Sequence, residues 1–262
     1  MAKEKKYKLS LPTSLDAIPL HQYQKYVKVI NEHKDNVDEE FLRLKLLEIF
    51  CGLTMREAYE LAAVDVDGII EILVNVLNSE SPLQRRFTMT DPKGIAVEFG
   101  FIPNLERISL GEFIDAEAYI SDWDNMHKAM AVLYRPLTGH KGEFYEIEKY
   151  EGSDKYAAIM ADAPASVAIG AMLFFLSFRD DIVSRYASLF SASSHDGFAG
   201  PASNQESFTK KWGWYQSIYA LAGGDVFRIS EVTGRDLHEC LLWLEFEKEK
   251  SQLEAQMLKQ YS

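Results

Sequence analysis

The segment from Ser191 to Ser207, SASSHDGFAGPASNQES, most constrains how this chain can fold, because it interrupts an otherwise regular pattern of apolar residues. It is rich in Ser, Gly, Ala and Asn, a composition that buries too little apolar surface to fix its own conformation. We therefore predict a flexible linker at 191–207. It would join a helical body at 1–190 to a small C-terminal helical interaction module at 208–262.

The body is predicted to be mainly helical. Apolar residues recur at helical spacing through most of 20–77 and 109–190,. Two stretches alternate instead, at 87–99 and around 144–150, and the first contains the turn sequence Asp-Pro-Lys-Gly at 91–94,. The pattern predicts a mainly α chain of the α+β class, with one or two short β-hairpins in the body.

Several helix starts carry their own capping signals. Thr54 with Glu57, and Ser109 with Glu112, have the spacing of a capping box, in which two backbone amides are satisfied reciprocally,. Asp67 is expected to cap a further helix, because the apolar residues at helical spacing follow it,.

Charge and composition argue against nucleic acid as a partner. The formal net charge is −12 and the sequence pI is near 5.0, so the average surface would repel a phosphate backbone,. A cluster of lysines near the N-terminus is interpreted as a solvated tail: Lys3, Lys5, Lys6 and Lys8,.

A membrane is not expected as a partner either. The start of the chain lacks the long apolar core of a signal peptide,. The most apolar stretch, 163–178, is shorter than the roughly 20 residues that cross a bilayer and ends at a charged cluster,. We interpret it as a buried core helix. Cys51 and Cys240 lie in apolar helical patterns and favour buried thiols in a reducing compartment over a disulfide,.

Motifs that carry chemistry are missing from the sequence. The six histidines are scattered without metal-ligand spacing, and no nucleophile elbow, Walker loop or dinucleotide-binding turn is present,. We therefore predict no catalytic residue, no metal and no cofactor. One polar region leaves an alternative open, since Asp115 to Lys128 could form an acid/base pocket or a cation site. The same carboxylates are typical of helix caps.

The C-terminal module is rich in aromatic residues, and such side chains dominate the energetic centres of protein interfaces,. Its last helix is expected to begin near Asp236. The first half of that helix is apolar nearly all round, whereas the second keeps one thin apolar seam among charges,. This favours a projecting helix that meets a partner, although a charged helix end lying on the body is an equal alternative. The predicted partner-binding residues are Trp212, Trp214, Tyr215, Leu242, Phe246, Leu253 and Met257.

The tail module sequence WGWYQSIYALAGGDVFRISEVTGRDLHECLLWLEFEKEK, behind a helical body and a Ser/Gly/Ala tether, resembles tailed-bacteriophage proteins of the tail-assembly-chaperone type. The segment IPLHQYQKYVKVI at 18–30 is similar to a second phage element. The body of this chain is larger than in the smaller family members and contains hairpins that they lack. The family has no catalytic residues to carry over.

The resemblance implies a non-enzymatic tail assembly factor in the host cytoplasm. Its partners would be tape-measure or tail-tube proteins, and further copies of itself. The alternative is a virion structural protein, such as a connector or tail-ring subunit. A third hypothesis is a small-molecule enzyme that uses the Asp115 to Lys128 region.

Overall fold

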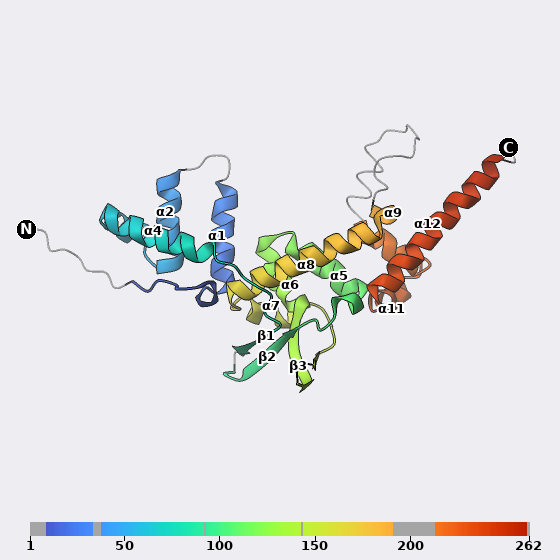
Figure 1. Ribbon diagram of the computed structural model, residues 1–262, viewed down its shortest axis with the longest axis horizontal. Helices are drawn as coiled ribbons and strands as arrows, with labels where there is room; N and C mark the ends of the chain where they lie inside the picture. The colour runs from blue at the N-terminus through green and yellow to red at the C-terminus, as the bar shows by residue number, and fades with distance from the viewer. Residues whose placement is uncertain (1–8, 34–37, 92, 143, 191–212, 261–262) are drawn as a thin grey trace, which may run out of the picture. The chain divides into compact units, whose positions relative to one another are not determined.

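Figure 1 shows the computed structural model, which describes residues 9–33, 38–91, 93–142, 144–190 and 213–260. The lysine cluster at 3–8, the predicted linker at 191–207 and Trp212 lie outside the described residues. The chain divides into two compact units. Unit 1 comprises 1–101 and 118–174, and unit 2 comprises 102–117 and 175–262. The predicted C-terminal module therefore groups with two segments of the predicted body, while the expected boundaries around the linker stay a prediction.

Unit 1 begins with a group of helices: α1 (Leu20–Glu32), α2 (Glu39–Cys51), α3 (Met55–Tyr59) and α4 (Ala63–Leu77). Gly52 ends α2 in the left-handed region at φ 68°, a conformation that glycine adopts without steric cost,. The side chains of Thr54 and Glu57 form the predicted capping box at the start of α3. A buried cluster joins these helices to the segment before α1 and to the start of α8: Leu15, Ile18, Phe50, Leu73, Val76 and Ala165.

The capping role predicted for Asp67 is wrong. Helix α4 begins at Ala63, so Asp67 lies inside the helix. Its carboxylate instead accepts a hydrogen bond from Arg43 of α2. The apolar residues before Asp67 extend the helix toward the N-terminus. The Asp67 carboxylate therefore binds Arg43 of α2 instead of the backbone amides at a helix start.

A four-stranded antiparallel sheet follows in the order β1-β2-β3-β4. Its strands are β1 (Arg86–Thr90), β2 (Ala96–Phe101), β3 (Tyr134–Lys141) and β4 (Phe144–Ile147). The β1–β2 turn is held by the Asp91 carboxylate, which accepts from the amides of Lys93 and Ile95 at 2.9 and 2.8 Å. The sheet consists of two hairpins, β1–β2 and β3–β4, which pair with each other through β2 and β3.

The rest of unit 1 packs on the largest buried aromatic side chains, Phe99, Phe101 and Tyr134. It includes α6 (Met126–Leu133), α7 (Asp154–Met160) and the first part of α8 (Ala165–Arg185). The apolar start of α8 is buried through Val167, Ala168 and Ala171, which confirms a core helix. Among the described residues, no helix is both long enough and apolar enough to cross a bilayer.

Unit 2 contains the second part of α8, a short α9 (Ala187–Phe190), a helical segment at 213–221, and α11 (Ile229–Thr233). It also holds the first part of α5 (Leu110–Ile120), the 3-10 turns η2 (Leu105–Arg107) and η4 (Val226–Arg228), and α12 (Leu237–Gln260). Its core is a cluster of rings in which Phe113 contacts Phe175 and Phe178 at centroid distances of 5.7 and 6.3 Å. The described chain is thus mainly helical with one small sheet, as predicted.

Candidate partner-binding helix

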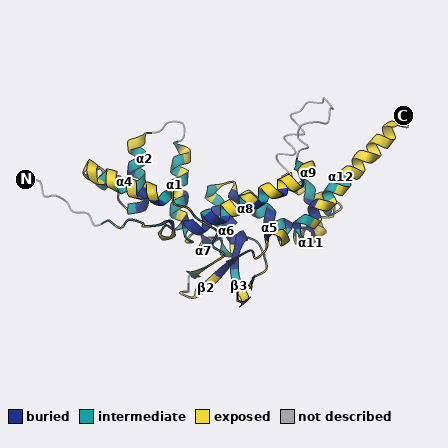
Figure 2. Cartoon of the chain, in the orientation of Figure 1, coloured by how far each residue is buried: buried dark blue, intermediate teal, exposed yellow. Residues whose placement is uncertain are grey.

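Helix α12 changes character along its length. Near its start, Leu237, Cys240 and Leu241 are at most 3% exposed. From Glu249 to Gln260 every residue is exposed (Figure 2). The second half projects from unit 2, as the alternation of apolar and charged residues predicts. Its binding of a partner stays a prediction.

The start of α12 is fixed by backbone hydrogen bonds to the start of α5. The Leu110 amide donates to the Arg235 carbonyl at 2.8 Å, and the Leu237 amide donates to the Ile108 carbonyl at 2.9 Å. The two segments approach so closely that a Cβ added to Gly111 would lie 3.1 Å from the Thr233 carbonyl oxygen. This crossing ties the root of α12 to the core of unit 2 before any side chain contributes.

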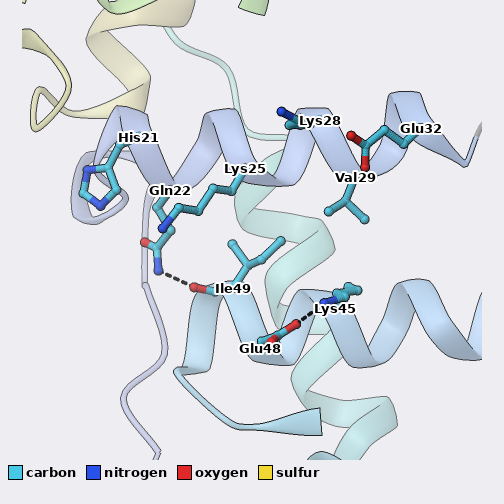
Figure 3. A pocket seen from close by; sticks show the side chains of 9 residues that line it. All are labelled: His21, Gln22, Lys25, Lys28, Val29, Glu32, Lys45, Glu48 and Ile49. Atoms are coloured by element: carbon cyan, nitrogen blue, oxygen red, sulfur yellow. Dashed lines mark hydrogen bonds and ion pairs between the residues drawn. The ribbon is translucent and has the colours of Figure 1, made fainter. Parts of the chain in front are cut away.

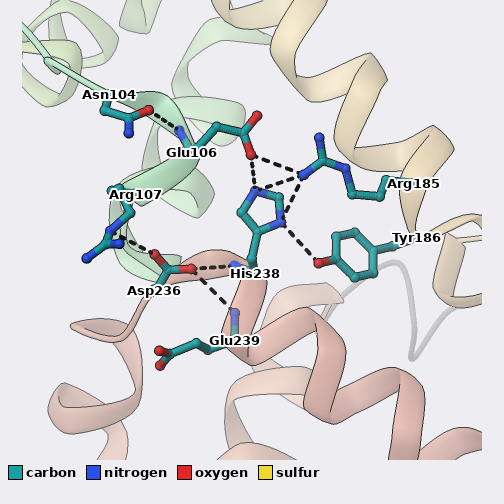
Figure 4. A network of polar contacts seen from close by, with 8 residues as sticks. All are labelled: Asn104, Glu106, Arg107, Arg185, Tyr186, Asp236, His238 and Glu239. Atoms are coloured by element: carbon teal, nitrogen blue, oxygen red, sulfur yellow. Dashed lines mark hydrogen bonds and ion pairs between the residues drawn. The ribbon is translucent and has the colours of Figure 1, made fainter.

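A polar network then surrounds the first turn of α12 (Figure 4). The Asp236 carboxylate accepts from the amides of His238 and Glu239 at 2.9 and 3.4 Å, and its second oxygen lies 3.9 Å from Arg107 Nε. A carboxylate at this position satisfies amides that have no partner within the helix and offsets the positive end of the helix dipole.

His238 is the centre of this network, and its side chain is 18% exposed. Its Nε2 lies 2.8 Å from Glu106 Oε2, and its Nδ1 lies 3.0 Å from the Tyr186 hydroxyl. Both contacts are satisfied if the proton sits on Nε2 and the tyrosine hydroxyl donates to Nδ1. Arg185 also reaches Glu106, at 3.1 Å. That hydrogen bond is the main cause that lowers the pKa of the Glu106 carboxyl, helped by the charge of Arg185,.

The middle of α12 is held by α9. The Ser188 hydroxyl donates to the Glu245 carboxylate, and the Lys248 ammonium donates to the Ser188 carbonyl. Beyond Lys248, the described residues supply no further support from another element. The projecting half depends on its own helix propensity, which is high for the Gln, Leu, Glu, Ala, Met and Lys that fill it,. Because the first half is already folded, the outer half avoids the cost of helix nucleation.

The apolar seam of α12 forms a narrow stripe. With about 100° of rotation per residue, its four members fall within an arc of about 60°. Their exposed fractions are 62, 59, 53 and 51% for Leu242, Phe246, Leu253 and Met257. We call these four residues the α12 stripe. Large apolar side chains in such an exposed row are typical of a surface that docks on another protein.

The aromatic residues that were expected to bind a partner are placed differently. Trp214 is half-buried, donates through Nε1 to Glu117 at 2.6 Å, and meets the rings of Phe113 and Phe190 edge-on. It therefore contributes to the packing of unit 2. Tyr215 is 46% exposed. Trp212 lies outside the described residues.

An exposed aromatic in η4 was not predicted as a surface residue. Phe227 in η4 is 91% exposed, and its neighbour Val226 is 63% exposed. The Asp225 carboxylate caps this turn by accepting from the Phe227 amide at 2.9 Å. An apolar pair directly after a Gly-Gly-Asp turn was the signal that could have indicated it.

The polar residues of the Asp115 to Lys128 region make both local and long-range contacts, and the long-range ones join Glu117 to Trp214, Asp124 to Lys28 and His127 to Gln24. Asp122 caps a 3-10 turn, η3 (Trp123–Asn125), by accepting from the Asp124 amide at 3.0 Å. Lys128 lies over the Tyr119 ring, and burial lowers the pKa of His127. Among the described residues, no group of His, Cys, Asp or Glu could hold a metal ion. Cys51 and Cys240 are both free thiols, and burial raises the pKa of each to about 11.

Comparisons of the chain with protein-family models, with curated proteins and with solved structures found no match.

Proposed function

We propose that this protein is a non-enzymatic assembly protein that binds another protein through the α12 stripe. The observation that carries the proposal is the α12 stripe, which is exposed from Leu242 to Met257 while the root of the same helix is buried and hydrogen-bonded. A helix presented in this way serves recognition, because the fold of unit 2 does not need those side chains.

The stripe is large enough to support a reversible complex. Fully burying a Leu, Phe or Met side chain contributes about 1.5 to 3 kcal/mol. The four stripe residues are each roughly half exposed, so covering them would contribute on the order of 3 to 6 kcal/mol. Association costs several kcal/mol in lost freedom, so the partner must add contacts of its own. A contact of this strength suits a protein that holds a client and later releases it.

The resemblance to tail-assembly chaperones supports a more specific form of the proposal. In that form the clients are tape-measure or tail-tube proteins, and the protein acts in the host cytoplasm. A retained connector or tail-ring subunit would use the same stripe against a permanent neighbour, so the stripe alone favours neither role.

Co-purification tests the binding role. The chain would be co-expressed with phage tape-measure and tail-tube proteins, either unchanged or with Leu253→Glu and Met257→Glu. The matched control, Ser251→Glu with Ala255→Glu, adds the same charge to the same helix on the face opposite the stripe,. We expect the stripe variant to lose the client and the control to keep it. Equal capture by both variants would refute the role of the stripe.

Copy number distinguishes an assembly factor from a virion subunit. Mass spectrometry of purified particles and of assembly intermediates would score the protein in each. Abundance in intermediates with absence from particles is expected for the assembly factor, and stoichiometric presence in particles would replace it with the structural role. If the protein occurs in neither, replacing Asp122 and His127 together tests the enzyme hypothesis by loss of function.

A further inference from the structure

A groove runs along unit 1 between α1 and α2 (Figure 3). It has a volume of about 410 Å³. Val29 and Ile49 give it an apolar surface, and the Gln22 side chain closes one end by donating to the Ile49 carbonyl. Along α1 the lining extends from His21 to Glu32, a length of about 16 Å at the helical rise. A groove of this length, with two apolar side chains among seven polar or charged ones, can take one row of side chains from a helix.

The rim of the groove is cationic in an acidic protein. Three lysines line it, Lys25, Lys28 and Lys45, against two carboxylates, Glu32 and Glu48. With His21 neutral, the formal charge of the lining is 3 − 2 = +1, whereas the whole chain carries −12. A positive patch on such a surface is a place where an acidic partner gains the most electrostatically.

Not all of these lysines are committed to partners within the chain. Lys45 is bound by Glu48 at 2.5 Å, and Lys28 lies 3.7 Å from Asp124 in an exposed pair. Lys25 makes no ion pair with another described residue, and Figure 3 shows its side chain extending from α1 toward α2. An exposed pair such as Lys28 with Asp124 contributes little and exchanges easily for a new one.

The stripe face of α12 has the complementary character. Within about 90° of the stripe centre lie four glutamates and one lysine: Glu239, Glu245, Glu249, Glu254 and Lys250. The formal charge of that face is 1 − 4 = −3, and Lys250 is itself paired with Glu247 at 3.8 Å. Lys248 and Lys259 lie on the far side of the helix. The part of the stripe from Phe246 to Met257 spans about 16 Å, the same length as the groove.

We propose that the α12 stripe of one copy docks in the α1–α2 groove of another copy. In this contact Phe246, Leu253 and Met257 cover Val29 and Ile49. Glu249 and Glu254 meet Lys25 and Lys28 on the rim. The inference rests on the binding role proposed for the α12 stripe, and it names a receiving surface that the proposed function does not require.

The symmetry of the contact follows from its two different halves. Each copy offers one α12 stripe and one groove, so the interface is heterologous. Repeated head-to-tail contacts of this kind close into a ring or extend into a filament, depending on the rotation between neighbours. The protein would therefore line up in a row rather than form a closed dimer.

Analytical ultracentrifugation of the full chain tests the contact. Over a range of micromolar concentrations we expect assemblies larger than a dimer, weakened by added salt because the rim charges are exposed. A groove variant, Lys25→Glu with Lys28→Glu, and a helix variant, Glu249→Lys with Glu254→Lys, should each weaken association at least tenfold. The control, Lys93→Glu with Lys149→Glu, applies the groove variant's charge change to exposed lysines elsewhere and should assemble as the unmodified chain does.

Two further experiments are decisive: mixing the two variants, and combining their four substitutions in one chain. The groove variant keeps an intact α12, the helix variant keeps an intact groove, and their two reversed surfaces are again opposite in charge, so an equimolar mixture should recover the assembly that each variant alone has lost. The chain that carries all four charge reversals should recover assembly. A monomeric unmodified chain, or assembly that survives both variants, would overturn the proposal.

The test also separates this inference from the proposed function. If the groove variant still captures tail proteins in the co-purification and all variants remain monomeric, the groove proposal fails and the binding role of α12 stands. If the Leu253→Glu and Met257→Glu variant keeps its client yet loses self-association, the stripe serves copies of the chain and the client role fails.

Discussion

The two halves of α12 differ although they belong to one continuous helix. The half that begins at Leu237 is capped by Asp236, held by α9 and buried at Leu237, Cys240 and Leu241, whereas the half from Glu249 to Gln260 is exposed at every residue. The comparison shows that, within α12, the residues that stabilise unit 2 are different from the exposed residues that a partner could contact. Substitutions at the buried residues of the first half should therefore change stability, and substitutions at the exposed stripe residues should change binding alone.

The largest difference between the halves is expected for a buried leucine. Leu241 is 1% exposed and Leu253 is 53% exposed. Replacing a buried leucine by alanine removes its burial and leaves a cavity, so Leu241→Ala should lower the free energy of unfolding by about 2 to 5 kcal/mol. Leu253→Ala should change it by less than about 0.5 kcal/mol. Urea unfolding followed by circular dichroism measures both, and equal losses would contradict the separation.

Thiol reactivity gives the second comparison, in a Cys51→Ser background. Burial raises the pKa of Cys240 from 9.0 to about 11, so its thiolate fraction near neutral pH falls about 100-fold. A cysteine placed in the exposed half by Ser251→Cys, with Cys240→Ala, should react with an alkylating reagent at the rate of a free thiol. A native Cys240 that reacts equally fast would show that the root of α12 opens.

The Tyr186 hydroxyl tests the network at the root more finely. Tyr186 is 8% exposed and its hydroxyl lies 3.0 Å from His238 Nδ1. Tyr186→Phe removes one hydrogen bond and should cost about 0.5 to 1.5 kcal/mol. Tyr219→Phe, at a tyrosine that is 54% exposed, should cost less than about 0.5 kcal/mol. Thermal melts of the two variants make the comparison, which fails if the exposed tyrosine costs more.

The smallest effect is a pH dependence at Glu106. Hydrogen bonding from Arg185 lowers the pKa of this carboxyl in the folded chain. A lowered folded pKa contributes stability that is present above the unfolded pKa of about 4.3 and lost as the pH falls through the folded value. The side chain is 53% exposed, so solvent screening keeps the contribution small. Between pH 7 and pH 3, the free energy of unfolding should fall slightly less for Glu106→Gln than for the unmodified chain. An equal fall in both would show that Glu106 does not contribute stability through this network.

Local features of the fold were predictable from sequence, because their partners lie close along the chain. The capping boxes at Thr54 and Ser109 are both present. The β1–β2 hairpin follows its turn sequence, and the α12 stripe follows from helical periodicity alone. The Asp67 prediction failed where a distant residue, Arg43, competed for the carboxylate.

Long-range features were not predictable in this way. The network joins His238 to Glu106 and to the neighbouring Arg185 and Tyr186, so three separate segments meet, and no spacing in the sequence brings them together. Trp214 was expected to face a partner because aromatic residues favour interfaces. Its packing depends on Phe113 and Phe190, which come from elements far from it in sequence. The α1–α2 groove likewise exists only after two helices pack.

The continuous helix of α12 also affects the rate at which a complex can form and the free-energy cost of ordering the residues that bind. A disordered segment must be ordered when it binds, which costs about 1 to 2 kcal/mol for the backbone of each residue. The outer half of α12 is already helical and needs only side-chain ordering,. A partner therefore binds a preformed helix, and the association rate is set by diffusion and orientation rather than by folding of that helix.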